Sequence, residues 1–126
     1  MKRKTTAVAV GAALALGIGA SANAGLHTMF PVTINDPAMT ANGDVSFVHN
    51  TPDVIQYLYC ESQGANARCV ARNLAGVVRS CSTANPAHLA AIHSMGTDSY
   101  LAFWWNAVGQ CTTVIVRNGS LTVPKA

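Results

Sequence analysis

Charged side chains are scarce in this sequence, and their signs nearly balance once the N-terminus is set aside. Asp, Glu, Lys and Arg make up 10% of the 126 residues, whereas soluble domains usually carry about a quarter. The formal net charge is +3, but three of the eight basic side chains stand at positions 2–4. The other five basic side chains are matched by five acidic ones. A basic surface for nucleic-acid phosphates is therefore not expected, and nucleic acid is excluded as a partner.

No apolar run in this sequence is long enough to cross a bilayer. The longest, residues 7–20, has 14 residues, and a spanning helix needs roughly 20. It follows Lys2-Arg3-Lys4 and leads into two small-x-small sites, Ala20-Ser21-Ala22 and Ala22-Asn23-Ala24. This order predicts a cleaved secretory signal peptide over residues 1–24 rather than a membrane anchor, with Ala22 as the alternative cleavage position. A single small β-rich domain over residues 25–126 should remain, secreted or periplasmic, with no membrane insertion after cleavage.

Motifs for metal binding and nucleophilic catalysis are also missing. There is no C-x₂-C pair for zinc and no G-x-S-x-G nucleophile motif. His88 and His93 are five residues apart and do not share a helix face as a metal-binding i, i+4 pair does. Asp36, Asn42 and Asp44 supply oxygen ligands for calcium, but they lack EF-hand spacing and suit turns better. We therefore expect no metal, no cofactor and no catalytic residue.

The four cysteines are Cys60, Cys69, Cys81 and Cys111. An even number in a small exported domain predicts two disulfides. The pairing Cys60–Cys69 with Cys81–Cys111 is favoured because it joins neighbours in the sequence. The alternative is Cys69–Cys81 with Cys60–Cys111, because a hairpin around residues 74–76 would place Cys69 opposite Cys81. A direct bridge there would require the closer, non-hydrogen-bonded type of strand pair.

Short runs of β-forming residues separated by turns dominate the chain. One helix is expected over about residues 86–95, with Asn85 as its cap, Pro86 at its first position and Gly96 after its end. The predicted fold class is α+β, mainly β: an antiparallel sheet of about five to seven strands with that short helix, held by disulfides. Strands are expected at residues 32–34, 45–49, 54–60, 67–73, 77–82, 100–106, 111–117 and 120–123, with a loop at 62–66 and an Asn118-Gly119 hairpin turn.

The aromatic strand over residues 100–106 is the strongest candidate for a binding site. Side chains alternate between the two faces of a strand, so one face should join the core. A four-residue loop should pair Phe103 with Val114 and Trp105 with Thr112. The other face places Trp104 and Tyr100 outward, and pairs Tyr100 with Arg117. The candidate binding residues are Trp104, Tyr100 and Arg117.

Trp104 and Tyr100 are suited to stack on a sugar or on a partner's side chain. The alternative is that the helix packs on this face, with Leu89 and Ile92 covering Trp104. Tyr57 and Tyr59 also share one strand face and are interpreted as sheet surface or packing residues. Arginines next to such rings would form cation–π contacts.

We expect a small exported, non-catalytic binding or inhibitor protein that acts outside the cytoplasm on an extracellular or envelope protein or glycan. The alternative is a structural or self-associating envelope protein, because low charge and free strand edges favour association. A small secreted hydrolase is a third possibility. Asn118-Gly119-Ser120 matches a glycosylation acceptor, although its hairpin role explains the same residues.

Overall fold

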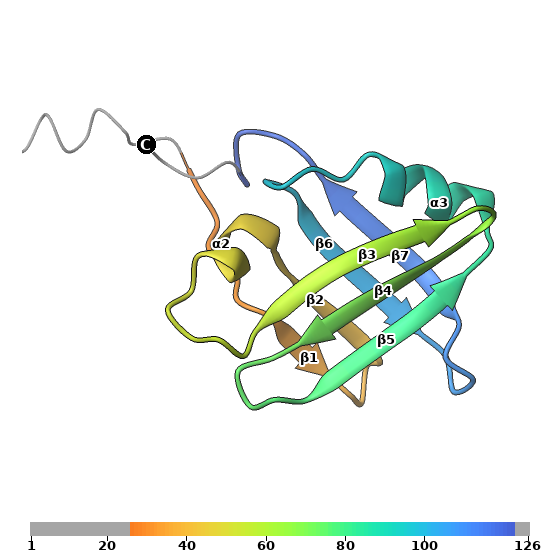
Figure 1. The fold of residues 1–126 in the computed structure, drawn as a ribbon, viewed down its shortest axis with the longest axis horizontal. Coiled ribbons are helices and arrows are strands. Elements are labelled where there is room, and N and C mark those ends of the chain that lie inside the picture. Colours follow the sequence, from red (N-terminus) through yellow and green to blue (C-terminus); the bar gives the residue numbers. More distant parts are fainter. Residues whose placement is uncertain (1–25, 123–126) are drawn as a thin grey trace, which may run out of the picture.

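The computed structural model describes residues 26–122, which form two antiparallel sheets with one sheet in front of the other (Figure 1). One sheet has the strand order β1-β2-β6-β7 and the other the order β3-β4-β5. The predicted signal peptide over residues 1–24 lies outside the described residues. The strands are β1 Thr33–Asn35, β2 Thr40–Asp44, β3 Tyr57–Gln63, β4 Asn66–Arg72, β5 Val78–Thr83, β6 Tyr100–Trp105 and β7 Cys111–Arg117, and the helices are α2 Val45–His49 and α3 Pro86–His93.

The hydrophobic core lies between the two sheets. Leu101 and Phe103 of β6 are fully buried there, and Leu58 of β3 reaches the same cluster from the other sheet. Helix α3 contributes Ile92 and packs against β7, β3 and β4, whereas α2 packs against β2 and β3. Within residues 26–122, neither helix is long and apolar enough to cross a membrane.

The favoured disulfide pairing is confirmed. Cys60–Cys69 joins two residues that face each other across β3 and β4, and Cys81–Cys111 joins β5 of one sheet to β7 of the other. The alternative Cys69–Cys81 bridge is wrong, although Cys69 does lie opposite Cys81 in the predicted β4–β5 register. Two disulfides indicate an oxidising environment outside the cytoplasm.

Both central hairpins follow their predicted registers closely. In β4–β5, Asn73 and Val77 close a turn in which Gly76 has a φ of +84°, a conformation that favours glycine. In β6–β7, Phe103 faces Val114 as expected. The prediction for Trp105 is wrong, because a β-bulge after Trp104 shifts its partner from Thr112 to Cys111.

The fold class is confirmed as mainly β with disulfides, but the strands divide between two sheets and a second helix is present. The prediction of a strand over residues 45–49 is wrong, because these residues form α2. This short helix packs against β3, and its residue Val48 is buried. Periodicity alone does not distinguish a short buried strand from a short helix in so brief an apolar run.

Three further expectations are corrected by the structure. Residues 40–44 form β2, although Asn42 and Asp44 are residue types that suit turns. Strand β3 starts at Tyr57 rather than at Val54, which is 98% exposed. The hairpin expected at Asn118-Gly119 does not form, because the segment bends back on itself and the N–H of Thr122 donates to the carbonyl of Gly119.

Candidate functional site

The outward surface of the β3-β4-β5 sheet carries the most distinctive group of exposed side chains. Direct pairing across β3 and β4 sets Tyr57 opposite Arg72, Tyr59 opposite Val70, and Glu61 opposite Arg68. Pairing with β5 adds Val78, Ser80 and Ser82 to the same side. We call this surface the tyrosine face and define it by these outward residues: Tyr57, Tyr59, Glu61, Arg68, Val70, Arg72, Val78, Ser80 and Ser82.

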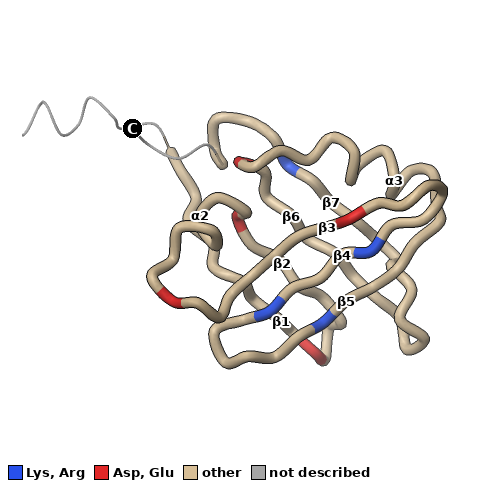
Figure 2. Tube along the Cα trace, in the orientation of Figure 1, with Lys and Arg blue, Asp and Glu red and all other residues tan. Residues whose placement is uncertain are grey.

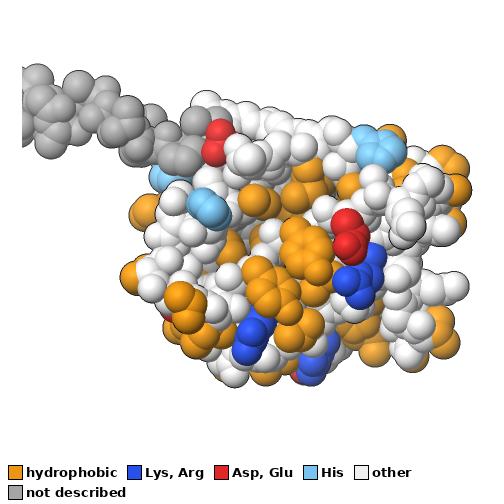
Figure 3. Space-filling model, viewed as in Figure 1, with side chains coloured by type: hydrophobic (Ala, Val, Ile, Leu, Met, Phe, Trp, Pro, Cys, Tyr) orange, Lys and Arg blue, Asp and Glu red, His pale blue; other side chains and the backbone are white. Residues whose placement is uncertain are grey.

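The centre of the tyrosine face is apolar and partly open to solvent. Tyr57 and Tyr59 are 37% and 38% exposed, and their ring centroids lie 5.9 Å apart with a tilt of 40° between the ring planes. Val78 is 43% exposed, whereas Val70 is only 4% exposed although it points outward. Hydrophobic side chains gather in the middle of this face, with charged side chains around them (Figure 3). The tyrosines therefore form a raised aromatic surface over a small apolar floor.

Arginines border the aromatic centre. The guanidinium carbon of Arg72 lies 6.0 Å from the ring centroid of Tyr57, which makes a cation–π contact. Arg68 forms an ion pair with Glu61, in which the nitrogen and the oxygen lie 3.6 Å apart and both side chains are exposed. Among ion pairs between the described residues none involves Arg72, and its buried Nε has no hydrogen-bond partner there.

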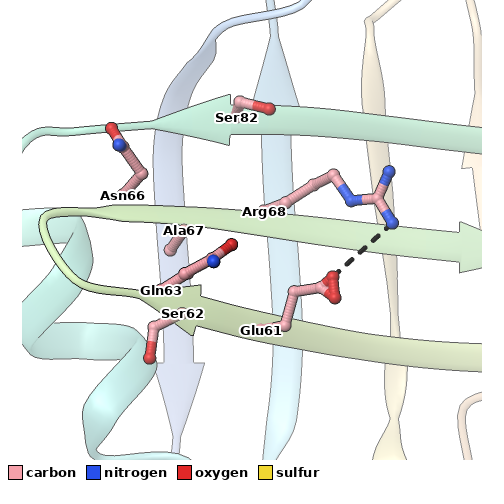
Figure 4. A pocket seen from close by; sticks show the side chains of 7 residues that line it. All are labelled: Glu61, Ser62, Gln63, Asn66, Ala67, Arg68 and Ser82. Atoms are coloured by element: carbon pink, nitrogen blue, oxygen red, sulfur yellow. Dashed lines mark ion pairs between the residues drawn. The ribbon is translucent and has the colours of Figure 1, made fainter.

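Next to this ion pair, the tyrosine face is hollowed at the β3–β4 hairpin. The depression has a volume of about 610 Å³ and combines the ion pair with amide and hydroxyl groups (Figure 4). The hairpin turns through Gly64, whose φ of +63° is the positive value that a two-residue hairpin turn requires. The lining residues are Glu61, Ser62, Gln63, Asn66, Ala67, Arg68 and Ser82.

A second hollow, of about 310 Å³, lies between α2 and β3 and is also lined by Tyr57 and Tyr59. Asp53 and Gln56 line its polar side. The backbone N–H and side-chain amide of Gln56, together with the N–H of Ile55, donate to the Asp53 carboxylate. These hydrogen bonds favour the charged form and hold the pKa of Asp53 far below its usual value. The two tyrosines thus stand between two hollows on one continuous surface.

The predicted binding residues lie on the outer face of the opposite sheet. Tyr100 and Arg117 face each other across β6 and β7, and the guanidinium carbon lies 4.5 Å from the ring centroid. Phe30 packs edge-on against the same ring, with the centroids 5.9 Å apart. Burial raises the pKa of the Tyr100 phenol. Much of the Tyr100 ring is thus occupied by contacts within the protein.

Trp104 is half-buried on this outer face, between its cross-strand neighbours Thr40 and Thr113. Helix α3 does not take the position that would cover it. Leu89 and Ile92 instead pack with the core cluster on the inner side of the sheet. The structure thus brings Trp104, Tyr100 and Arg117 to one face, and their role in binding stays a prediction.

The residues considered for calcium have other roles in the structure. Both oxygens of Asp36 accept hydrogen bonds from Arg79 at 2.7 Å, which lowers the pKa of Asp36. Asp44 is fully buried and accepts a hydrogen bond from the N–H of Phe30. Between residues 26 and 122, no group of three or more His, Cys, Asp or Glu side chains is placed to hold a metal ion.

The Asn118 side chain is engaged within the fold. Its amide nitrogen donates to the carbonyl of Ser94, and its oxygen accepts a hydrogen bond from the Ser99 hydroxyl. Asn118 therefore ties the end of β7 to the loop between α3 and β6. This local role accounts for the residue without a glycan.

The sequence carries a signal for the tyrosine face, although the same alternation is typical of ordinary sheet surface. Tyr57, Tyr59 and Glu61 alternate along one strand, and Arg68 and Arg72 alternate along the next. Their register, however, depends on the hairpin between them. The predicted five-residue loop is a two-residue turn in the structure, with Gln63 paired to Asn66.

Comparisons of this chain with protein-family models, curated proteins and solved structures found no match.

Proposed function

We propose that this is a small non-catalytic binding protein that acts outside the cytoplasm on a glycan or protein partner, and that it is exported by the signal peptide over residues 1–24. The observation that carries the proposal is the tyrosine face. Its two adjacent, partly exposed tyrosines are bordered by arginines on a sheet that two disulfides hold in place. Tyrosine and arginine are the residue types enriched at the energetic centres of interfaces.

Rigidity supports this proposal. The Cys60–Cys69 bridge lies directly beneath the outward pair of Tyr59 and Val70, because it links the adjacent residues of the same two strands. A rigid aromatic pair loses little conformational entropy when a partner binds. The outer face with Trp104, Tyr100 and Arg117 is the second candidate surface, favoured by exposed Ile115 beside buried Ala102.

The test applies labelled, oxidised protein to arrays of glycans and of envelope proteins. We expect the double variant Tyr57→Ala/Tyr59→Ala to bind at least about tenfold more weakly, because truncated aromatic anchors usually cost more than 1 kcal/mol. Val108→Ala is the matched control, since Val108 is exposed in the β6–β7 turn of the other sheet. Circular dichroism checks that each variant keeps the fold.

Other outcomes would redirect or overturn the proposal. Loss of binding in Trp104→Ala with full binding in the tyrosine variant would move the site to the opposite sheet. Concentration-dependent assembly in sedimentation experiments, without any partner, would favour a self-associating envelope protein. Turnover of a bound glycan would favour the small hydrolase.

A further inference from the structure

We infer that the partner of the tyrosine face is an acidic polysaccharide, a chain of sugar units that carry carboxylates; this inference rests on the proposed function. Between residues 26 and 122 the chain has four arginines. Three of them, Arg68, Arg72 and Arg79, lie on β4 and β5 (Figure 2). Arg68 and Arg72 belong to the tyrosine face, whereas Arg79 alternates to the other side of the sheet.

The three arginines differ in how strongly they are already paired. Arg79 is held by two hydrogen bonds of 2.7 Å to Asp36 and so is not free to bind a ligand. Arg68 has only a single, exposed contact of 3.6 Å with Glu61. Arg72 is half-buried and has no carboxylate partner among the described residues. Its Nε is enclosed by the protein, so a ligand would reach the two terminal nitrogens of the guanidinium.

Arg72 therefore has the unused capacity of an anion site. A guanidinium offers five N–H donors in one plane and binds a carboxylate through two parallel hydrogen bonds. Its contact with the Tyr57 ring holds the group beside the aromatic surface. Because Arg72 is partly removed from water, a carboxylate there gains more than it would from a fully exposed arginine.

The neighbouring groups suit a sugar chain. Tyr57 and Tyr59 lie two residues apart on one strand, roughly 7 Å along its axis, so they present successive apolar surfaces to an extended polymer. Further along β3 the hollow offers Gln63 and Asn66, whose amides match sugar hydroxyls as donors and acceptors. The result is a narrow track along the β3–β4 pair, in which the two tyrosines and Arg72 are followed by the Glu61–Arg68 ion pair and then by the amides.

The apolar part of this track is small for a protein partner. Its exposed apolar side chains are Tyr57, Tyr59 and Val78, each less than half exposed. A stable protein interface usually covers about 800 Å² on each partner. A single polysaccharide chain needs only such a track and gains affinity from charge along its length.

The test compares polygalacturonate and alginate with fully methyl-esterified polygalacturonate, which keeps the sugar backbone and lacks the charge. Isothermal titration calorimetry of the oxidised protein should show at least about tenfold stronger binding of the acidic chains, the equivalent of one charge-assisted contact. Arg72→Gln should abolish this preference, and Arg72→Lys should restore part of it. Arg117→Gln, which removes the same charge on the opposite sheet, should retain the preference.

Failure of this inference is separable from failure of the proposed function. Equal binding of the charged and esterified chains would overturn the acidic class of ligand, and an unchanged preference in Arg72→Gln would overturn Arg72 as the carboxylate site. Binding itself stands in both cases. The inference is also overturned if neither acidic chain binds, or if the tyrosine variant loses an envelope protein instead of a glycan. The proposed function fails if the protein assembles without any partner or turns over a bound glycan, whereas loss of binding in Trp104→Ala alone would move the site to the opposite sheet.

Discussion

Asp53 holds the segment that leads into the tyrosine face. It accepts hydrogen bonds from the backbone of Ile55 and Gln56 and from the Gln56 side chain, and the Gln56 oxygen in turn accepts from the N–H of Val32. This chain of contacts fixes the segment that leads into Tyr57. It also ties that segment to the residue before β1. A single carboxylate thus sets the direction in which β3 begins.

We predict that Asp53 makes stability depend on pH in the acid range. Its pKa is lowered in the folded state from the ordinary value of about 3.9, so its stabilising effect is present above that value and is lost as pH falls below it. Asp53→Asn should therefore flatten the fall in Tm between about pH 5 and pH 2. Thermal unfolding followed by circular dichroism measures this slope. Asp98→Asn controls for the loss of one charge, and a wild-type slope in Asp53→Asn would refute the prediction.

Structural roles that depend on neighbouring residues alone were predictable from the sequence. Asn85 caps α3 by accepting a hydrogen bond from the N–H of Ala87, and Pro86 takes the first helical position. The helix ends at His93, before the expected stop at Gly96, because Ser94 serves as its C-cap. Local chemistry fixes a cap, whereas the exact helix end depends on packing.

One disulfide lies within a hairpin, and the other joins the two sheets. Cys60–Cys69 spans 9 residues within the β3–β4 hairpin, and Cys81–Cys111 spans 30 residues and joins the two sheets. The sheets also meet where the N–H of Ser82 donates to the carbonyl of Gly109. The longer bridge is therefore the one that holds the sandwich together.

We predict that the longer bridge contributes more to stability. From loop length, Cys81→Ala/Cys111→Ala should lower the free energy of unfolding by about 3.7 kcal/mol, and Cys60→Ala/Cys69→Ala by about 2.6 kcal/mol. Guanidinium unfolding of both double variants measures the difference. A larger loss in the Cys60/Cys69 variant would contradict this order.

Elements built from sequence neighbours were predictable, and elements defined by distant contacts were not. The β4–β5 and β6–β7 pairs follow from their turns. Strand β2 contains Asn42-Gly43-Asp44, which resembles a turn locally, yet it pairs with β6 some 60 residues later. Gly43 is favoured there by close packing rather than by φ, since a Cβ would lie 3.1 Å from both Leu58 and the carbonyl oxygen of Pro31.

The arrangement of the whole molecule explains why the sequence predicts which residues share a strand face but not which face is exposed. Alternation alone identifies which residues share a strand face. It does not show that the strands divide into two sheets, so it leaves open which faces point to solvent. Strand β6 carries four aromatic rings, of which Phe103 and Trp105 join the core as predicted and Tyr100 and Trp104 lie on the outer face.

The two sheets lie back to back, so the tyrosine face and the Trp104 face point in opposite directions. Each is built on two or more strands whose inner side chains form the shared core. A substitution of an outward side chain on one face therefore tests that face with little effect on the other. The two candidate faces can therefore be tested separately by substitution.

The most direct test of the tyrosine face is a titration of ¹⁵N-labelled, oxidised protein with oligogalacturonate, followed residue by residue in NMR spectra. The account predicts that the largest amide shifts fall in β3 and β4, at residues 57–61 and 68–72, and that Tyr57→Ala/Tyr59→Ala abolishes them. Shifts centred on Trp104 and β7 would contradict the tyrosine face as the site, and no shifts in wild-type protein would contradict an acidic polysaccharide as its ligand.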